Sequence, residues 1–320
     1  RHQRAQPRGM NHLQPARGIT AHGRSKVGLL AGWGRYPLVV AEALVERGYL
    51  TYCLGVKGHA DPALAAVCHD FRWLGLARLG EAARYFKRHG VRDVTMAGKI
   101  HKALLFGRWA WLKHLPDYRT LRRFYKHFLL NRRDRQDDTL LMAVVKEFAV
   151  DGIHFAPATD YVPELLVKFG QLTLRGPSAA QQQDIEFGWK LAKELGRLDV
   201  GQSVAIKGRA ALAVEAIEGT DQCIQRAGTL CPSGGFTVVK VAKPQQDMRF
   251  DVPTIGLGTL ESMVQAGATC LAIEAGRTIL VDQAKVIQLA DQHQLAIVSL
   301  SADGECPRPS PETLCESRER

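Results

Sequence analysis

Short apolar runs alternate regularly with helix-like segments along this chain. The predicted strands cover 27–31, 50–56 and 94–97, and the predicted helices cover 38–48 and 80–89. Strands that alternate with helices are typical of a parallel sheet whose crossover connections are helical. We therefore predict an α/β fold, with a doubly wound parallel sheet over residues 27–155.

The second half of the chain keeps the alternation but adds a β-hairpin, which turns at Lys207-Gly208-Arg209. Helices are predicted from Gln181 to Leu195, ended by Gly196, and from Thr220 or Asp221 to Gly228. Further strands are expected at 236–243, 268–275 and 295–300, and further helices at 259–266 and 283–292. The pattern predicts a mixed α/β domain over residues 181–300, with 156–180 as the linker.

Composition and charge set the two ends of the chain apart from the rest. Of the 320 residues, 46% are apolar and 23% are charged, the balance of an ordinary globular protein. The net charge of +11 is concentrated, since residues 1–26 hold six basic side chains and no acidic one. Residues 1–26 and 301–320 have no periodic pattern, so we expect a basic disordered tail and a polar one.

The cysteine content and the hydropathy of the chain indicate the cellular compartment in which the protein folds. The seven cysteines are scattered and form no CxxC pair, so neither a disulfide framework nor a zinc site is expected. No apolar run approaches the roughly 18 residues that a membrane span needs. We expect a protein of the reducing cytoplasm.

Two glycine-containing turns follow predicted strands of the first domain. Gly32 and Gly34 lie between the first strand and its helix, and Gly98-Lys99 ends the third strand. A turn at this place in a doubly wound sheet can bind phosphate or ribose. A plain tight turn explains the first pair equally well, and the full fingerprint of a dinucleotide site is missing.

Residues 99–135 combine 11 basic side chains with seven aromatic ones. Three interpretations compete: a helix with a buried aromatic face and a solvated basic face, an RNA-binding patch, and an interfacial helix on anionic lipid. Composition alone does not separate the last two. Asp137 and Asp138 follow, where they could cap a helix or bind a sugar hydroxyl or a metal.

Charged side chains of the second domain gather where predicted strands end or turn. They are Glu218, Asp221, Lys240, Lys243, Asp247, Arg249, Asp251 and Glu274. Carboxylates with lysine and arginine are what phosphoryl chemistry on a diphosphate needs, with Mg²⁺ or Mn²⁺ on the carboxylates. A purely structural pair of Arg249 with Asp251 is the alternative.

Six sequence blocks in order then resemble a known family. They are GLLAGWGRYP, AGK, DDTLL, GRLDVGQSVAIKGRAALAVEAIEGTD, KPQQDMRFDVPTIGLGT and IEAGRTILVD, spread over about residues 27–300. Together they closely resemble the two-domain UDP-2,3-diacylglucosamine pyrophosphatases of lipid A synthesis, which differ from the calcineurin-like enzymes of the same step. The chain departs from the family pattern at His101-Lys102-Ala103, usually an Arg-Pro pair, and at Gln136, usually glycine.

The resemblance implies a Rossmann-like first domain, a second domain of its own topology, and a lipid nucleotide bound between them. It implies Mg²⁺-dependent attack of water on the α-phosphorus, which gives UMP and 2,3-diacylglucosamine 1-phosphate, and it ties Asp251 to catalysis. It also implies a homodimer on the cytoplasmic face of the inner membrane of a Gram-negative-type bacterium, with no nucleic-acid partner. The alternative is a non-catalytic protein that binds RNA or lipid.

The expected roles of the residues follow from the clusters and the resemblance together. For catalysis we expect Asp251, Asp221 and Arg249, and for the metal Asp251, Asp221, Glu218 and Asp247. For substrate binding we expect Gly32, Gly34, Gly98, Lys99, Asp137, Asp138, Lys240, Lys243 and Glu274.

Overall fold

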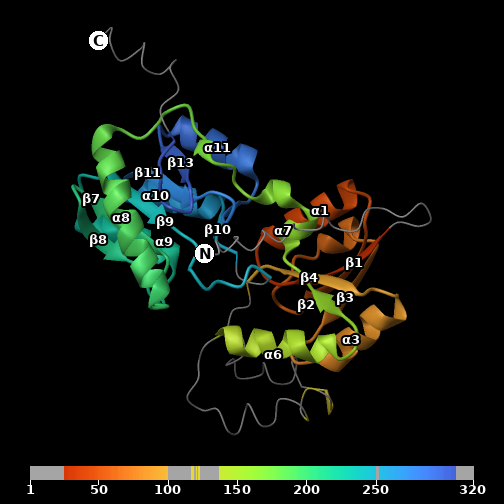
Figure 1. The fold of residues 1–320 in the computed structure, drawn as a ribbon. Helices are drawn as coiled ribbons and strands as arrows, with labels where there is room; N and C mark the ends of the chain where they lie inside the picture. Colours follow the sequence, from red (N-terminus) through yellow and green to blue (C-terminus); the bar gives the residue numbers. More distant parts are fainter. Residues whose placement is uncertain are drawn as a thin grey trace, which may run out of the picture.

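A computed structural model of the chain describes residues 25–99, 117, 118, 120, 122, 137–249 and 252–307. Most of each predicted tail, most of the basic and aromatic stretch at 99–135, and Asp251 lie outside these residues. The described part forms two large sheets, one in each half of the chain, with helices packed against both (Figure 1).

The first sheet has five strands, all parallel, in the order β3-β2-β1-β4-β5. The strands are β1 (Lys26–Ala31), β2 (Leu50–Val56), β3 (Asp70–Leu74), β4 (Asp93–Ala97) and β5 (His154–Phe155). The chain winds away from β1 in one direction through β2 and β3, and in the other through β4 and β5. This is the doubly wound order, and its switch point lies between β1 and β4.

Helices cover both faces of this sheet. One face carries α1 (Tyr36–Glu46), α2 (Leu64–Val67) and α7 (Ala158–Tyr161), and the other carries α3 (Leu79–Arg88) and α6 (Asp137–Ala149). Leu29 of β1 and Leu44 of α1 are fully buried in the first core, while Phe86 and Phe148 are almost fully buried in the second. Two separate cores on one parallel sheet confirm the predicted α/β architecture.

The second sheet is mixed, in the order β6-β13-β11-β9-β7-β8. Its strands are β6 (Gly170–Gln171), β7 (Ser203–Lys207), β8 (Ala210–Val214), β9 (Phe236–Lys240), β11 (Ala268–Glu274) and β13 (Ala296–Leu300). Strands β9, β11 and β13 are parallel, whereas β6, β7 and β8 run antiparallel to their neighbours. The predicted hairpin is confirmed, with Gly208 and Arg209 both at positive φ.

Four long helices cover the second sheet. Helix α8 (Ala179–Arg197) packs on one face, and α9 (Thr220–Leu230), α10 (Leu257–Ala266) and α11 (Gln283–Gln292) pack on the other. A capping box fixes the start of α8: the Ser178 hydroxyl accepts a hydrogen bond from the Gln181 backbone N–H, and the Gln181 side chain binds back to Ser178.

Two glycines that predict helix ends do not end their helices. Helix α8 continues through Gly196 to Arg197, and α9 continues through Gly228 to Leu230. A Cβ atom at Gly228 would lie 2.7 Å from the carbonyl oxygen of Ala266 in α10. Close packing of α9 against α10 therefore explains Gly228. A single sequence does not distinguish a glycine with this role from a glycine that ends a helix.

The predicted linker contains α7, the 3₁₀ turn Pro163–Leu165 and β6. Its helix α7 packs on the first sheet, and the part after α7 runs along the second domain, where the Val167 N–H donates to the carbonyl oxygen of Thr278. A two-stranded parallel sheet, β10 (Thr254–Ile255) with β12 (Ile279–Leu280), lies on the same side. At the beginning of the predicted C-terminal tail, residues 301–307 form a turn in which Gly304 lies close to Trp189.

None of the helices in the described ranges is long and apolar enough to cross a bilayer.

Candidate active site at the carboxyl edges of the two sheets

The glycine turns of the first domain meet at the switch point of the sheet. The backbones of Trp33 and Lys99 pair in both directions, with N···O distances of 2.7 and 3.0 Å. A Cβ at Gly32 would lie 2.7 Å from the carbonyl oxygen of Lys99, and one at Gly98 would lie 2.8 Å from that of Trp33. The four predicted residues Gly32, Gly34, Gly98 and Lys99 thus lie together, at the edge where open α/β sheets bind ligands.

Asp137 and Asp138 are the first two residues of α6. Their side chains lie outside the described part, so their predicted contact with a sugar or metal stays a prediction.

The second sheet brings a lysine and two helix starts to its own carboxyl edge. Lys240, the last residue of β9, is 5% exposed, and its Nζ donates to Thr220 Oγ1 and to the carbonyl oxygen of Thr254, both at 3.1 Å. The Thr220 hydroxyl in turn donates to Glu215 Oε1 at 3.0 Å. The Lys240 ammonium group is thus nearly buried at this edge, next to the first residue of α9.

Helices α9 and α10 pack side by side and both begin at this edge. Glycines occupy both N-caps, Gly219 and Gly256, and no side chain in the described ranges caps either helix. Asp221 lies in the first turn of α9, and its Oδ1 accepts a hydrogen bond of 2.8 Å from the Thr259 hydroxyl. Two helix N-termini beside Lys240 give this edge a positive potential suited to phosphate.

Glu274 ends β11 and is completely buried. Its Oε2 accepts hydrogen bonds from Lys193 Nζ at 2.7 Å and from the Ala242 backbone N–H at 2.8 Å. Its Oε1 is also buried, has no hydrogen-bond partner among the described residues, and lies 3.7 Å from Arg277 Nη1. Glu274 thus holds the segment that leaves β9, and its predicted contact with substrate stays a prediction.

Four more predicted residues are engaged in ion pairs. Glu218 binds Arg226 at 2.7 Å, Lys243 binds Asp199 at 2.6 Å, and Asp247 binds Arg249 at 2.5 Å. The hydrogen bonds from the Arg249 guanidinium hold the pKa of Asp247 below its usual range. Arg249 therefore forms an ion pair with Asp247 in this structure. The sequence predicts a catalytic role for Arg249 and a metal-ligand role for Asp247.

Contacts between the halves link the two edges. Arg35, directly after the first glycine turn, lies 3.2 Å from Asp282 at the start of α11, and this hydrogen bond raises the pKa of Arg35. Arg249 also reaches α6, with Nη2 2.9 Å from the sulfur of Met142. These two contacts join α6 and the start of α1 to the second domain.

The predicted metal ligands fit Mg²⁺ only in part. No three His, Cys, Asp or Glu side chains of the described ranges form a group that could hold a metal ion. Glu218 and Asp247 are held by arginines, whereas Asp221 accepts its hydrogen bond from the neutral hydroxyl of Thr259. Mg²⁺ commonly takes only one or two carboxylates together with substrate phosphates, so Asp221 fits it among the described residues. Asp251 lies outside those residues.

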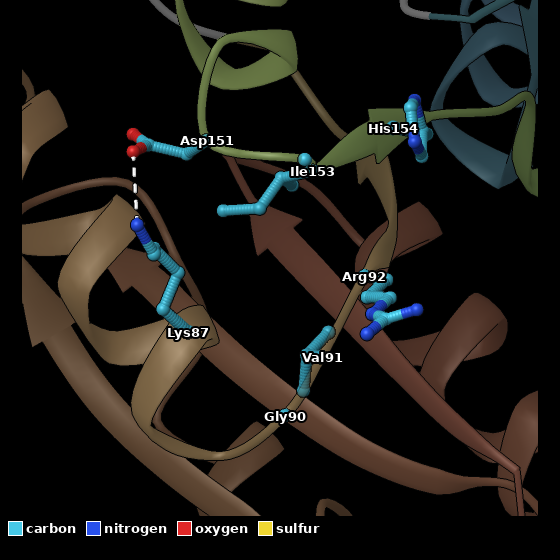
Figure 2. A pocket seen from close by; sticks show the side chains of 8 residues that line it. Lys87, Gly90, Val91, Arg92, Asp151, Ile153 and His154 are labelled. Atoms are coloured by element: carbon cyan, nitrogen blue, oxygen red, sulfur yellow. Dashed lines mark hydrogen bonds and ion pairs between the residues drawn. The ribbon is translucent and has the colours of Figure 1, made fainter.

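A pocket of about 460 Å³ lies elsewhere, at the amino ends of β4 and β5 (Figure 2). Lys87 and Asp151 form an ion pair of 3.2 Å on one side, and Arg92 and His154 lie across from them. None of the predicted site residues lines this pocket. It is on the opposite edge of the sheet from the glycine turns and is therefore separate from the candidate site.

Some residues of the site are not predictable from charge patterns. Lys193 and Thr259 carry no motif, and each meets its partner, Glu274 or Asp221, across a long sequence separation. The only sequence signal for Lys193 is its position on the side of the helix that faces the sheet. This signal does not identify Glu274 as its partner.

Comparison with family models decides the relationship. The model described as the LpxI N-terminal domain matches residues 26–165, and the one described as the LpxI C-terminal domain matches residues 168–298. The chain belongs to the LpxI family. A curated LpxI protein of Caulobacter vibrioides, named UDP-2,3-diacylglucosamine pyrophosphatase LpxI, is 29% identical over 282 residues, which cover 86% of this chain and 97% of that protein. The resemblance predicted from the sequence blocks is confirmed.

Proposed function

We propose that this protein hydrolyses the diphosphate of UDP-2,3-diacylglucosamine in lipid A synthesis. The observation that carries the proposal is the match to the Caulobacter pyrophosphatase over nearly its whole length. The carboxyl edges of the two sheets support it physically. One offers the turn at Gly34, where a Cβ atom would have nothing within 4 Å, and the other offers Lys240 and two helix starts to a diphosphate.

In the proposed reaction, water adds to the α-phosphorus and the bond from that phosphorus to the bridging oxygen breaks. The products are UMP and 2,3-diacylglucosamine 1-phosphate, and the bridging oxygen leaves with the sugar phosphate. We assign the binding of phosphate oxygens, as negative charge shifts during the displacement, to Lys240 and the N-termini of α9 and α10, which lie at one edge of the second sheet. Asp251 is the proposed acceptor of the proton from the attacking water, or a metal ligand.

We further propose Mg²⁺, with Mn²⁺ as a substitute, bound by Asp221 and Asp251 together with the diphosphate. A bound magnesium ion would neutralise phosphate oxygens and so lower the barrier to attack. EDTA should abolish turnover and added Mg²⁺ should restore it. Full activity in EDTA would show that hydrolysis needs no metal, but it would not contradict the proposed hydrolysis itself.

One experiment tests both the reaction and the attacked atom. The protein is incubated with UDP-2,3-diacylglucosamine in detergent micelles containing ¹⁸O-labelled water, and the products are analysed by mass spectrometry. We expect UMP carrying one ¹⁸O and an unlabelled sugar phosphate. Label in the sugar phosphate would place the attack on the β-phosphorus, and absence of UMP would refute the hydrolase and favour a binding protein.

We also propose that the protein is a homodimer. We propose in addition that it associates with the cytoplasmic face of the inner membrane, in part through residues 104–128. The support is the sequence of that segment, which alternates aromatic and basic side chains, and the diacylated substrate of the named relative. Light scattering coupled to gel filtration measures the subunit number. Loss of vesicle binding on addition of RNA would favour the RNA interpretation of the segment.

A further inference from the structure

Three large apolar side chains stand in solvent on two neighbouring loops of the second domain. Leu198 is 60% exposed, Val200 is 46% exposed, and Ile217 is fully exposed. Leu198 and Val200 follow α8, and Ile217 lies between β8 and α9. We call these three residues the edge patch.

The two loops are in direct contact. Gly201 approaches Glu215 so closely that a Cβ atom would lie 2.0 Å from the Glu215 carbonyl oxygen, and the Gln202 N–H donates to Glu215 Oε2. Glu215 also accepts the hydrogen bond from Thr220 that connects it to Lys240. The edge patch is therefore next to the candidate site, at the end of α8 that points down in Figure 1.

The charges around the patch are compensated. Three acidic side chains beside it are in ion pairs, Glu194 with Arg197, Asp199 with Lys243, and Glu218 with Arg226, and a fourth, Glu215, is buried. A surface whose acids are neutralised by arginine and lysine does not repel anionic headgroups, and the long basic side chains can extend to them.

We propose that the edge patch inserts into the interface of a lipid bilayer and presents the carboxyl edge of the second sheet to a membrane-held substrate. The inference rests on the proposed function, because a substrate with two acyl chains resides in the bilayer. Ile217 is fully exposed in the turn between β8 and α9, which suits entry into a fluid interface.

The test is co-sedimentation with vesicles of phosphatidylglycerol and phosphatidylcholine, without substrate. The triple variant Leu198→Ser, Val200→Ser, Ile217→Ser should bind at least about tenfold more weakly than the wild type, since three apolar side chains no longer enter the interface. The matched control is Leu174→Ser with Leu230→Ser, because both leucines are as exposed but lie at the other end of the domain. The control should bind like the wild type.

Equal binding by the triple variant and the wild type, or equal loss in the control pair, would overturn the proposal. A change of the triple variant from dimer to monomer in light scattering would also overturn it, since the patch would then be a subunit interface. Hydrolysis in detergent micelles is measured on the same samples. It should be near normal in the triple variant, so failure of the membrane proposal and failure of the proposed hydrolysis give different results.

Discussion

The buried carboxylate of Glu274 fixes the path of the chain at Ala242, whose backbone N–H donates to Glu274 Oε2 at 2.8 Å. The same oxygen lies 2.7 Å from Lys193 Nζ in α8. One side chain at the end of β11 thus ties a helix on one face of the sheet to the segment that leads from Lys240 toward Asp247.

Glu274→Gln should lower the free energy of unfolding by about 2 kcal/mol or more, because Lys193 loses its partner in a mostly buried place. Chemical denaturation measures the loss. The control is Glu194→Gln, which breaks the exposed Glu194–Arg197 pair and should cost less than about 1 kcal/mol. Similar small losses in both variants would mean that the buried pair contributes little.

Asp251→Ala should lower the rate of UMP release about 100-fold or more and leave the melting temperature nearly unchanged, if Asp251 is a general base or metal ligand. Glu194→Ala, a substitution on the surface of α8, is purified and assayed in the same way, as the control. It should keep full activity. A lower melting temperature with near-normal turnover in the folded fraction would show that Asp251 is structural.

The pKa of Asp247 is lowered by its hydrogen bonds to Arg249, which predicts a particular pH dependence. A depressed pKa in the folded state means that the pair stabilises the protein fully above the unfolded pKa of about 4. This stabilisation is lost as the pH falls from there through the folded pKa. The difference in unfolding free energy between wild type and Asp247→Asn should therefore be constant at neutral pH and shrink below pH about 4. A difference that persists at low pH would argue against the ion pair.

Gly228→Ala should destabilise the protein by about 1–3 kcal/mol, although alanine is the better helix former. The added methyl would meet the Ala266 backbone at 2.7 Å. A Cβ atom added at Gly258 in α10 would have nothing within 4 Å, so Gly258→Ala is the matched control and should be neutral or stabilising. Thermal melts of both variants decide whether α9 and α10 are packed as tightly as described.

The sequence predicts the strands of both sheets well where buried runs are continuous, as in β9 and β13, and it predicts the hairpin turn from Gly208. It misses β3, whose Arg72 and Trp73 are exposed on an edge strand and blur the pattern. The carboxylates show a second limit. Glu218 and Asp247 look like metal ligands in the sequence, but in the structure arginines eight and two residues away bind them. Which cation a carboxylate meets depends on side-chain geometry that residue types do not encode.

The hairpin of β7 and β8 has a practical consequence for handling the protein. Because β7 runs antiparallel to β9, its exposed turn at Gly208-Arg209 is at the far end of the sheet from Lys240. A tag inserted in this turn would anchor every molecule on a sensor chip in the same orientation. The end of the second sheet that carries Lys240 would then face the flowing solution, so vesicles and nucleotides could be presented to it without removing the anchor.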